Sequence, residues 1–174
     1  LINNAGFGRE GAFAEIDVDG QVEMINVHVV ATVRLTRAAL PGMIQRRRGT
    51  IINVSSLAGF MSVPKAVTYC ATKAYLNVFS ETIAAELRGT GVHVELLCPG
   101  YTYTGFHDTE EYQDFDRSQI PKWLWMSADA VVASSLKALD RKRFLCIPGV
   151  RYRLLAIVIR SRLFRPILRA MANR

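Results

Sequence analysis

The feature that most constrains the fold is a strand–helix–strand unit in the middle of the chain. Residues 50–55 are Thr-Ile-Ile-Asn-Val-Ser, a short β-branched and apolar run that is typical of a strand buried on both faces. Residues 68–88 are predicted to form a long helix that ends at Gly89 and Gly91, and residues 92–97 form the next strand. Because strands joined by a helix of ten or more residues run parallel, this unit predicts an α/β fold with a mainly parallel sheet.

The rest of the chain extends this alternation of strands and helices. The predicted elements are a strand that ends before Gly6, a loop at 7–14, a helix from Asp19 to Pro41–Gly42, a long loop or lid with short helical pieces at 101–126, a helix at 128–139 and a strand at 144–147. Ligands of such sheets bind outside the carboxyl ends of the strands. We therefore expect the chemistry in the segments 3–6, 55–59 and 99–104.

Composition excludes several other classes of protein. The chain has 174 residues, of which 50% are hydrophobic and 21% charged, so it can bury the core of one domain. Its longest apolar run near the C-terminus, at 154–159, is too short to span a membrane, which needs roughly 20 residues. Three widely spaced cysteines argue against a disulfide scaffold and for a reducing compartment, so the predicted location is cytoplasmic.

The net charge of +7 resides in the tail of the chain. Residues 151–174 hold seven arginines and no acid, whereas the preceding 150 residues are balanced. Nucleic-acid binding is therefore not expected. The tail alternates arginines with apolar residues and is interrupted at Pro166, so it is a basic amphipathic segment. It lies either peripherally on an anionic membrane surface or, the favoured interpretation, against the body or a sister subunit.

The pair Tyr69 and Lys73 carries the clearest chemistry. Residues four apart share one face of a helix, so the lysine ammonium can lie near the phenol. A nearby cation stabilises phenolate, and we expect it to lower the pKa of Tyr69 and produce a general acid/base. Ser56 lies at the carboxyl end of a predicted strand, 13 residues before Tyr69. Its hydroxyl could hold a substrate oxygen while the phenol exchanges the proton.

The remaining motifs indicate no further functional site. Gly6, Gly8 and Gly11 form a G-x-G-x-x-G pattern, but no helix opens directly after it and no acid follows about 20 residues later, so it is interpreted as a glycine-rich loop. His28, His93 and His107 lack the spacing of metal ligands, and no metal site is expected. A G-x-S-x-G nucleophile elbow is absent, which counts against a hydrolase.

The ordered set of motifs resembles one known family, the short-chain dehydrogenases/reductases of the classical type. The matching parts are Asn3-Asn4-Ala5-Gly6, Asn26, Ser56, Tyr69-Cys70-Ala71-Thr72-Lys73 and Pro99-Gly100-x-x-x-Thr104. The resemblance covers residues 1–150 and implies the C-terminal part of a doubly wound parallel-sheet Rossmann fold, strands 4 to 7 with their flanking helices. The family's glycine-rich cofactor turn belongs to an earlier strand, so we expect a piece of an enzyme of about 250–300 residues.

The resemblance also implies a role for each matching residue. Tyr69 would be the general acid/base, Ser56 would polarise the carbonyl, Lys73 would bind the nicotinamide ribose, and Asn26 would hold a water of a proton relay. The cofactor-binding residues would be Asn4, Ala5, Gly6, Tyr69, Lys73, Pro99, Gly100, Thr102 and Thr104. Residues 105–127 would form the substrate loop.

The activity that follows is NAD(P)(H)-dependent interconversion of an alcohol and an aldehyde or ketone. The sequence does not choose between NAD and NADP. Residues 123–126, Trp-Leu-Trp-Met, favour a small apolar carbonyl or alcohol substrate. The family resemblance implies a homodimer or homotetramer. The alternatives are a non-catalytic cofactor-sensing protein and a membrane-surface adaptor built on the same fold.

Overall fold

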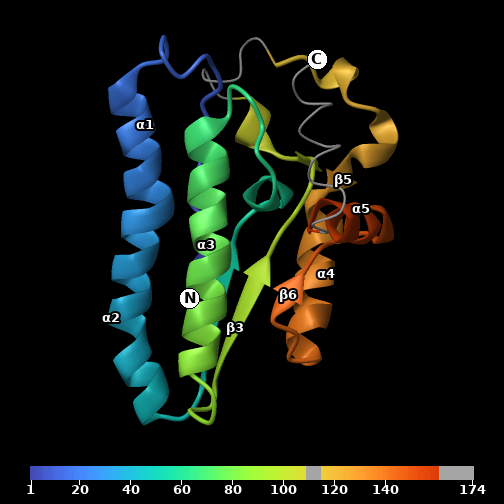
Figure 1. The fold of residues 1–174 in the computed structure, drawn as a ribbon. Coiled ribbons are helices and arrows are strands. Elements are labelled where there is room, and N and C mark those ends of the chain that lie inside the picture. Colours follow the sequence, from blue (N-terminus) through green and yellow to red (C-terminus); the bar gives the residue numbers. More distant parts are fainter. Residues whose placement is uncertain (109–114, 161–174) are drawn as a thin grey trace.

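The sheet is four-stranded and entirely parallel. The computed structural model describes residues 1–108 and 115–160. Its strands are β1 (Ile2–Asn3), β2 (Gly49–Val54), β3 (Val92–Leu97) and β6 (Leu145–Cys146), in the order β1-β2-β3-β6 (Figure 1). All three pairings are parallel, and Ile52 of β2 lies opposite Ile2 on one side and Glu95 on the other. The predicted parallel α/β fold is therefore confirmed.

Helices cover both faces of this sheet. On one face, α1 (Val18–Ile25), the π-helical turn η1 (Asn26–Val30) and α2 (Ala31–Gln45) form a continuous column that lies beside α3 (Val67–Glu86). On the other face lies α4 (Ala128–Asp140).

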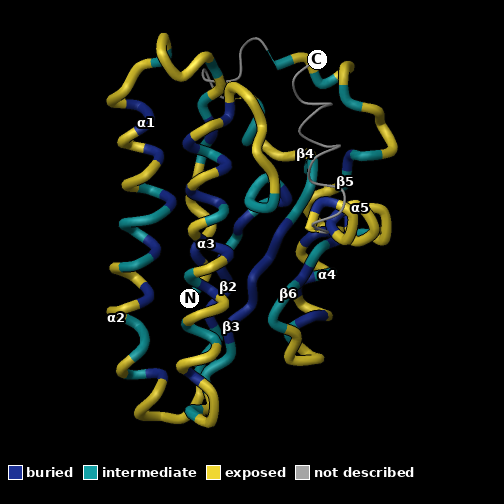
Figure 2. Tube along the Cα trace, viewed as in Figure 1, coloured by how far each residue is buried: buried dark blue, intermediate teal, exposed yellow. Residues whose placement is uncertain are grey.

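Neighbouring residues of β2 point to opposite faces of the sheet, so each strand serves two cores. Ile51 packs with Met43 and Val94, whereas Ile52 packs with Leu97 and Val131. This arrangement explains the continuous apolar runs of β2 and β3, and Figure 2 shows β3 buried along most of its length.

The C-terminal boundary of the first predicted helix differs from the prediction. The helix expected to end at Pro41–Gly42 continues to Gln45, with Pro41 inside α2. Met43, in the extra turn, is buried in the core against Gly49, and this packing stabilises the turn. Pro41 removes one backbone hydrogen bond of α2 but leaves the face of the helix that packs on the core intact. Asp17, at the start of α1, accepts hydrogen bonds from the backbone N–H groups of Asp19 and Gly20, as expected of an N-cap.

The segment predicted as a long loop with short helical pieces contains such pieces and, in addition, two strands. Two short strands, β4 (Thr102–Tyr103) and β5 (Met126–Ser127), pair in parallel, and short 3₁₀ turns occupy Gly105–His107, Arg117–Gln119 and Lys122–Leu124. Aromatic contacts hold these pieces together, with Tyr103 stacked on Trp125 at a centroid distance of 4.8 Å. Residues 109–114 of the predicted substrate loop lie outside the described residues.

The predicted tail begins as a helix that packs on the body. Helix α5 (Val150–Arg160) buries Tyr152, Ala156 and Ile159, and Tyr152 and Ala156 join Leu57 in a small core. Residues 161–174, with Pro166, lie outside the described residues, so the role of the tail as a separate unit stays a prediction. Within residues 1–108 and 115–160, no helix has the length and apolarity needed to cross a membrane.

Candidate active site

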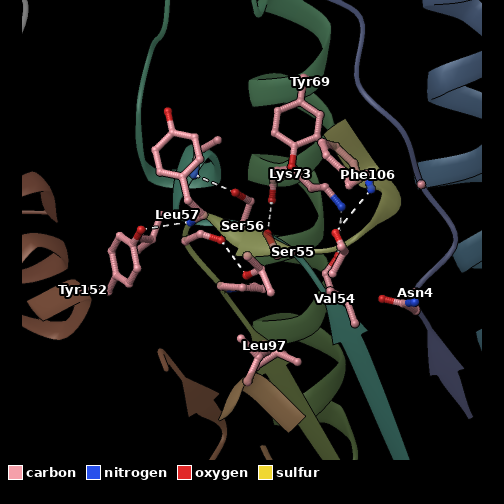
Figure 3. A pocket seen from close by; sticks show the side chains of 18 of the residues that line it. Asn4, Val54, Ser55, Ser56, Leu57, Tyr69, Lys73, Leu97, Phe106 and Tyr152 are labelled. Carbon is pink, nitrogen blue, oxygen red and sulfur yellow. Dashed lines mark hydrogen bonds between the residues drawn. The ribbon is translucent and has the colours of Figure 1, made fainter. Parts of the chain in front are cut away.

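A cavity of about 710 Å³ opens at the carboxyl ends of β1, β2 and β3. This is the edge of the sheet at which ligands of parallel α/β proteins bind. Most of the residues singled out from the sequence line it. They are Asn4, Gly6, Ser56, Tyr69, Lys73, Pro99, Gly100, Thr102 and Thr104. Figure 3 shows Tyr69, Lys73, Ser56 and Asn4 around this space.

Helix α3 presents Tyr69 and Lys73 on one face. The Lys73 Nζ lies 5.6 Å from the centre of the Tyr69 ring. It also donates a hydrogen bond of 3.0 Å to the carbonyl oxygen of Val54, the last residue of β2. The lysine side chain is buried, with 6% of its surface exposed, so this bond holds the ammonium at the strand end beside the phenol.

The two serines after β2 have different surroundings. The Ser55 hydroxyl lies 2.6 Å from Asn77 Oδ1 and 3.0 Å from the Lys73 carbonyl oxygen, so it ties the strand end to α3. Ser56 caps the 3₁₀ turn η2 (Leu57–Phe60), and its hydroxyl lies close enough to the Tyr69 phenol to oppose the rise in the pKa of that group. Ser55 therefore has a structural position, and Ser56 faces the phenol.

Burial dominates the electrostatics of the pair, and this differs from the prediction. The pKa of Tyr69 is raised to about 12, because desolvation of the phenolate outweighs the stabilising hydrogen bond from Ser56. Desolvation likewise lowers the pKa of Lys73 to about 8. The expectation that Lys73 lowers the pKa of Tyr69 below its ordinary value was therefore wrong. At neutral pH, Tyr69 carries its proton.

Asn26 does not join this group. It is the first residue of η1, its side chain is exposed, and it does not line the cavity. His28 is 1% exposed and reaches α3 instead, with its ring edge-on to Tyr69 at 5.9 Å. Residues two apart on a helix lie on nearly opposite sides, so a buried His28 directs Asn26 outward. A histidine two residues beyond the motif asparagine was the sequence signal that was missed.

The two asparagines of the Asn3-Asn4 pair lie in different environments, one in the core and one at the cavity. Asn3 is buried and donates from Nδ2 to Asn53 Oδ1 (2.7 Å), while Asn53 donates from Nδ2 to Ser80 Oγ (2.8 Å). This chain of amides links β1, β2 and α3 inside the core. Asn4 lies past the strand end and lines the cavity; Ala5 is exposed beside it and is not among the lining residues.

The far wall of the cavity depends on α5, which the sequence analysis treated as separate. The Tyr152 hydroxyl donates to the Leu124 carbonyl oxygen (2.5 Å) and accepts from the Tyr101 N–H (3.0 Å). A Cβ on Gly100 would fall 2.1 Å from the Tyr152 ring, so the close approach requires glycine. Phe106 adds a further aromatic wall, 5.9 Å from the Tyr69 ring.

The comparisons with known proteins agree with this geometry. The family model for short chain dehydrogenases matches residues 1–114. The ketoacyl reductase HetN of Nostoc sp. is 37% identical over 145 residues, an alignment that covers 82% of this chain and 48% of HetN. A short-chain dehydrogenase from Sphingobium yanoikuyae, solved in complex with NADPH, has a TM-score of 0.79 and 30% identity, over 89% of this chain and 60% of that chain. One from Burkholderia phymatum, solved with NAD, has a TM-score of 0.77 and 26% identity, over 91% and 63%.

The fold and the matches define a class of parallel α/β proteins, of which the two solved examples above contain NADPH or NAD. Within that class, this chain belongs to the short-chain dehydrogenase family. It spans about a third to a half of the length of the curated relatives it matches. Within the described part of the chain, no group of three or more histidines, cysteines or acids is arranged to hold a metal ion.

Proposed function

We propose that this chain supplies the catalytic residues of an NAD(P)H-dependent reductase of apolar aldehydes or ketones. The observation that carries the proposal is the meeting of Tyr69, Ser56 and Lys73 at one wall of the cavity. A protonated phenol beside a serine hydroxyl is suited to donate a proton to a carbonyl oxygen. The name of the relative HetN, a ketoacyl reductase, supports the same direction.

The residues of the cavity fit a nicotinamide cofactor. The Lys73 ammonium has three N–H donors and uses one of them on the Val54 carbonyl oxygen, so donors remain for ribose hydroxyls. Asn4, Gly6 and Thr102 line the same space and would lie along the cofactor, with Ala5 adjacent. When bound, reduced nicotinamide supplies the hydride that reduces the carbonyl carbon.

The protein residues then handle the oxygen and its proton. Ser56 holds the carbonyl oxygen, and the Tyr69 hydroxyl transfers its proton to that oxygen as the carbon receives the hydride. Once the carbonyl has become the alcohol, Tyr69 would be left as phenolate. The Lys73 ammonium stabilises this phenolate until a proton from water restores the phenol. Oxidation of the alcohol follows the same steps in reverse.

The lining of the cavity supports an apolar substrate. Phe106, Phe115, Leu124 and Met61 contribute apolar surface around the polar group of Ser56 and Tyr69. The predicted residue Trp125 is buried behind this wall, whereas Trp123 is 58% exposed. The proposed substrates are therefore carbonyl compounds with an apolar chain, and 3-oxoacyl thioesters are the first class to test.

The two adjacent serines provide a test of the function. With NADPH or NADH and a panel of apolar ketones and 3-oxoacyl thioesters, turnover is followed by cofactor absorbance. Ser56→Ala is expected to lower kcat by about a hundredfold, because it removes a hydrogen bond to the reacting oxygen. It is expected to lower the unfolding temperature only slightly, because it also removes the cap of η2. Ser55→Ala is expected to lower the unfolding temperature, because Asn77 loses its buried partner. Absence of turnover across the panel, or equal kinetics in both variants, would contradict the proposal.

A non-catalytic cofactor-sensing protein is the second candidate, and the geometry does not favour it. A cofactor-sensing protein would not need the Ser56 hydroxyl beside the Tyr69 phenol, or the buried Lys73 ammonium.

We also propose a homo-oligomer formed through the two long helices. Exposed apolar side chains on these helices, Val22, Leu35 and Val78, support that assembly. The three cysteines are free and buried, which suits the predicted cytoplasmic location.

The outer face of α5 supports peripheral contact with an anionic membrane. Val150, Leu154 and Ile157 are 60–66% exposed on the side opposite Tyr152, with Arg153 and Arg160 beside them. Leu154→Glu is expected to reduce co-sedimentation with phosphatidylserine vesicles about tenfold, because it places an acid on the inserted face. Val18→Glu, an equally exposed site on α1, is the control. Equal binding of both variants and the parent protein would refute membrane contact through α5.

A further inference from the structure

His28 joins the turn after β1 to the helix that carries Tyr69 and Lys73. It lies within the π-helical turn η1, where the Ala31 N–H bonds to the Asn26 carbonyl oxygen. Such π turns recur at functional positions in helices. The imidazole is buried, with 1% of its surface exposed, and both of its nitrogens have partners.

The partners of the two nitrogens define one tautomer. Thr72 of α3 donates its only hydroxyl proton to the Tyr69 carbonyl oxygen at 2.9 Å. The Thr72 oxygen must then accept from His28 Nδ1, which lies 2.9 Å away, so Nδ1 carries the proton. His28 Nε2 is the acceptor for the Phe7 N–H, at 3.2 Å. The ring is therefore neutral, with Nδ1 donating to Thr72 and Nε2 accepting from the Phe7 N–H.

The glycine of the Asn3-Asn4-Ala5-Gly6 motif is part of the same arrangement. A Cβ on Gly6 would lie 2.7 Å from His28 Nε2 and 3.1 Å from Cδ2. Because the ring is held at both nitrogens and is buried, it has no room to move away. The imidazole thus packs directly against the backbone of the turn that lines the cofactor side of the cavity.

The charges around His28 favour its neutral form. Burial, and then the ammonium of Lys73, lower the pKa of His28 to about 3, against a smaller opposing effect of the hydrogen bond with the Phe7 backbone. Tyr69, the other titratable group of α3 in contact with the ring, keeps its proton at neutral pH. From the turn, Gly6 and Phe7 contribute no titratable group. A neutral ring leaves Lys73 as the cation beside the phenol without a competing charge.

We propose that His28 is a positioning residue: a neutral imidazole, protonated on Nδ1, that fastens the Asn4–Gly6 turn to the catalytic face of α3 and so sets the cofactor against Tyr69. The kinetic part of this inference rests on the proposed function. The structural part, the tautomer and the two hydrogen bonds, does not. Asn26, exposed on the other side of the helix, has no share in this role.

The first test needs no substrate. It measures the His28 clamp, by which we mean the hydrogen bonds of His28 to Thr72 and to the Phe7 N–H. Imidazole nitrogen chemical shifts from NMR are expected to show His28 protonated on Nδ1 and unchanged from pH 8 to pH 5. The Phe7 amide is expected to exchange with solvent about tenfold faster in His28→Leu than in the parent protein, as for loss of one partly buried hydrogen bond. His28→Gln, whose amide oxygen can accept from the Phe7 N–H, is expected to restore slow exchange. A proton on Nε2, titration near pH 6.5, or unchanged exchange in His28→Leu would overturn the proposal.

The second test measures the consequence for the cofactor. In the active protein, His28→Leu is expected to raise the KM for the cofactor about tenfold with a smaller change in kcat, and His28→Gln to recover most of it. Thr72→Val removes the other end of the clamp, so the double variant with His28→Leu is expected to be no worse than the more impaired single variant. Additive effects would overturn the proposal. If the NMR results hold but no variant or parent protein turns over substrate, the clamp stands and the proposed function fails.

If His28→Leu does not fold, the measurement on the parent protein still decides the tautomer. Thr72→Ser then serves as the conservative partner of Thr72→Val. Serine keeps the hydroxyl that accepts from Nδ1, so Thr72→Ser is expected to retain the imidazole shifts and the cofactor KM, whereas Thr72→Val changes both. Identical behaviour of the two threonine variants would contradict the proposed hydrogen bond.

Discussion

Tyr69→Phe is expected to reduce kcat about a thousandfold while cofactor affinity changes by less than about twofold. The variant removes the hydroxyl that would donate the proton, yet it keeps the ring that packs against His28 and Phe106. Because the pKa of Tyr69 is raised to about 12, the phenol is fully protonated at neutral pH and its loss removes the acid itself. Steady-state kinetics and cofactor fluorescence measure the two quantities separately.

Tyr75→Phe is the matched control for this variant. Tyr75 lies on the same helix, is 41% exposed and stacks on Phe79 away from the cavity. Its hydroxyl has no place in the proposed chemistry, so kcat is expected to remain within about twofold of the parent value. Turnover in Tyr69→Phe that matches the Tyr75→Phe control would show that another group supplies the proton.

Lys73→Met is expected to lose activity and yet gain stability at neutral pH. Loss of the ammonium that stabilises the phenolate is expected to lower kcat by about a hundredfold to a thousandfold. Burial lowers the pKa of Lys73 from 10.5 to about 8, which corresponds to a cost of about 3 kcal/mol for the charged form at pH 7. Methionine removes this cost but leaves the Val54 carbonyl oxygen without its donor, a loss of about 1 kcal/mol. We therefore expect a net gain of about 2 kcal/mol in the free energy of unfolding.

The same variant has a defined pH signature. Since the folded pKa of this base is lowered, unfolding takes up a proton between pH 8 and 10.5, and the parent protein gains stability as pH rises through that window. Lys73→Met lacks this gain, so its advantage at pH 7 is expected to disappear by pH 10.5. Chemical denaturation at several pH values measures the difference. Lys137→Met, at an exposed position of α4, is the control for removing a lysine side chain. A stability difference that is constant with pH would refute the assignment of a strongly buried charge.

The regular elements could be predicted because their signals are local. The strand at 92–97 has the predicted bounds, and α3 differs from the predicted helix by one or two residues at its ends. Apolar runs and glycine stops depend on neighbouring residues only, so they can be recognised along the chain. The motif residues Ser56, Tyr69 and Lys73 followed from spacing in the same way, and the structure brings them to one cavity.

Three features could not be predicted because they depend on contacts between distant segments. The pKa of Tyr69 depends on how much solvent the surrounding loops exclude, and spacing to Lys73 gave the wrong sign. The path of the 101–126 segment depends on Tyr152, about 50 residues further along the chain. The inward direction of His28 depends on the π turn and on its partners in the β1 turn and α3.

The sequence alone predicts the parallel α/β fold, the family and the Tyr69–Lys73 pair, because patterns of apolar residues and helical spacing are properties of contiguous segments. The tertiary structure was needed to show which residue of the first helical column reaches the phenol, and that α5 completes the cavity wall. These outcomes follow from packing and desolvation, which arise when segments far apart in the chain exclude water from the same space.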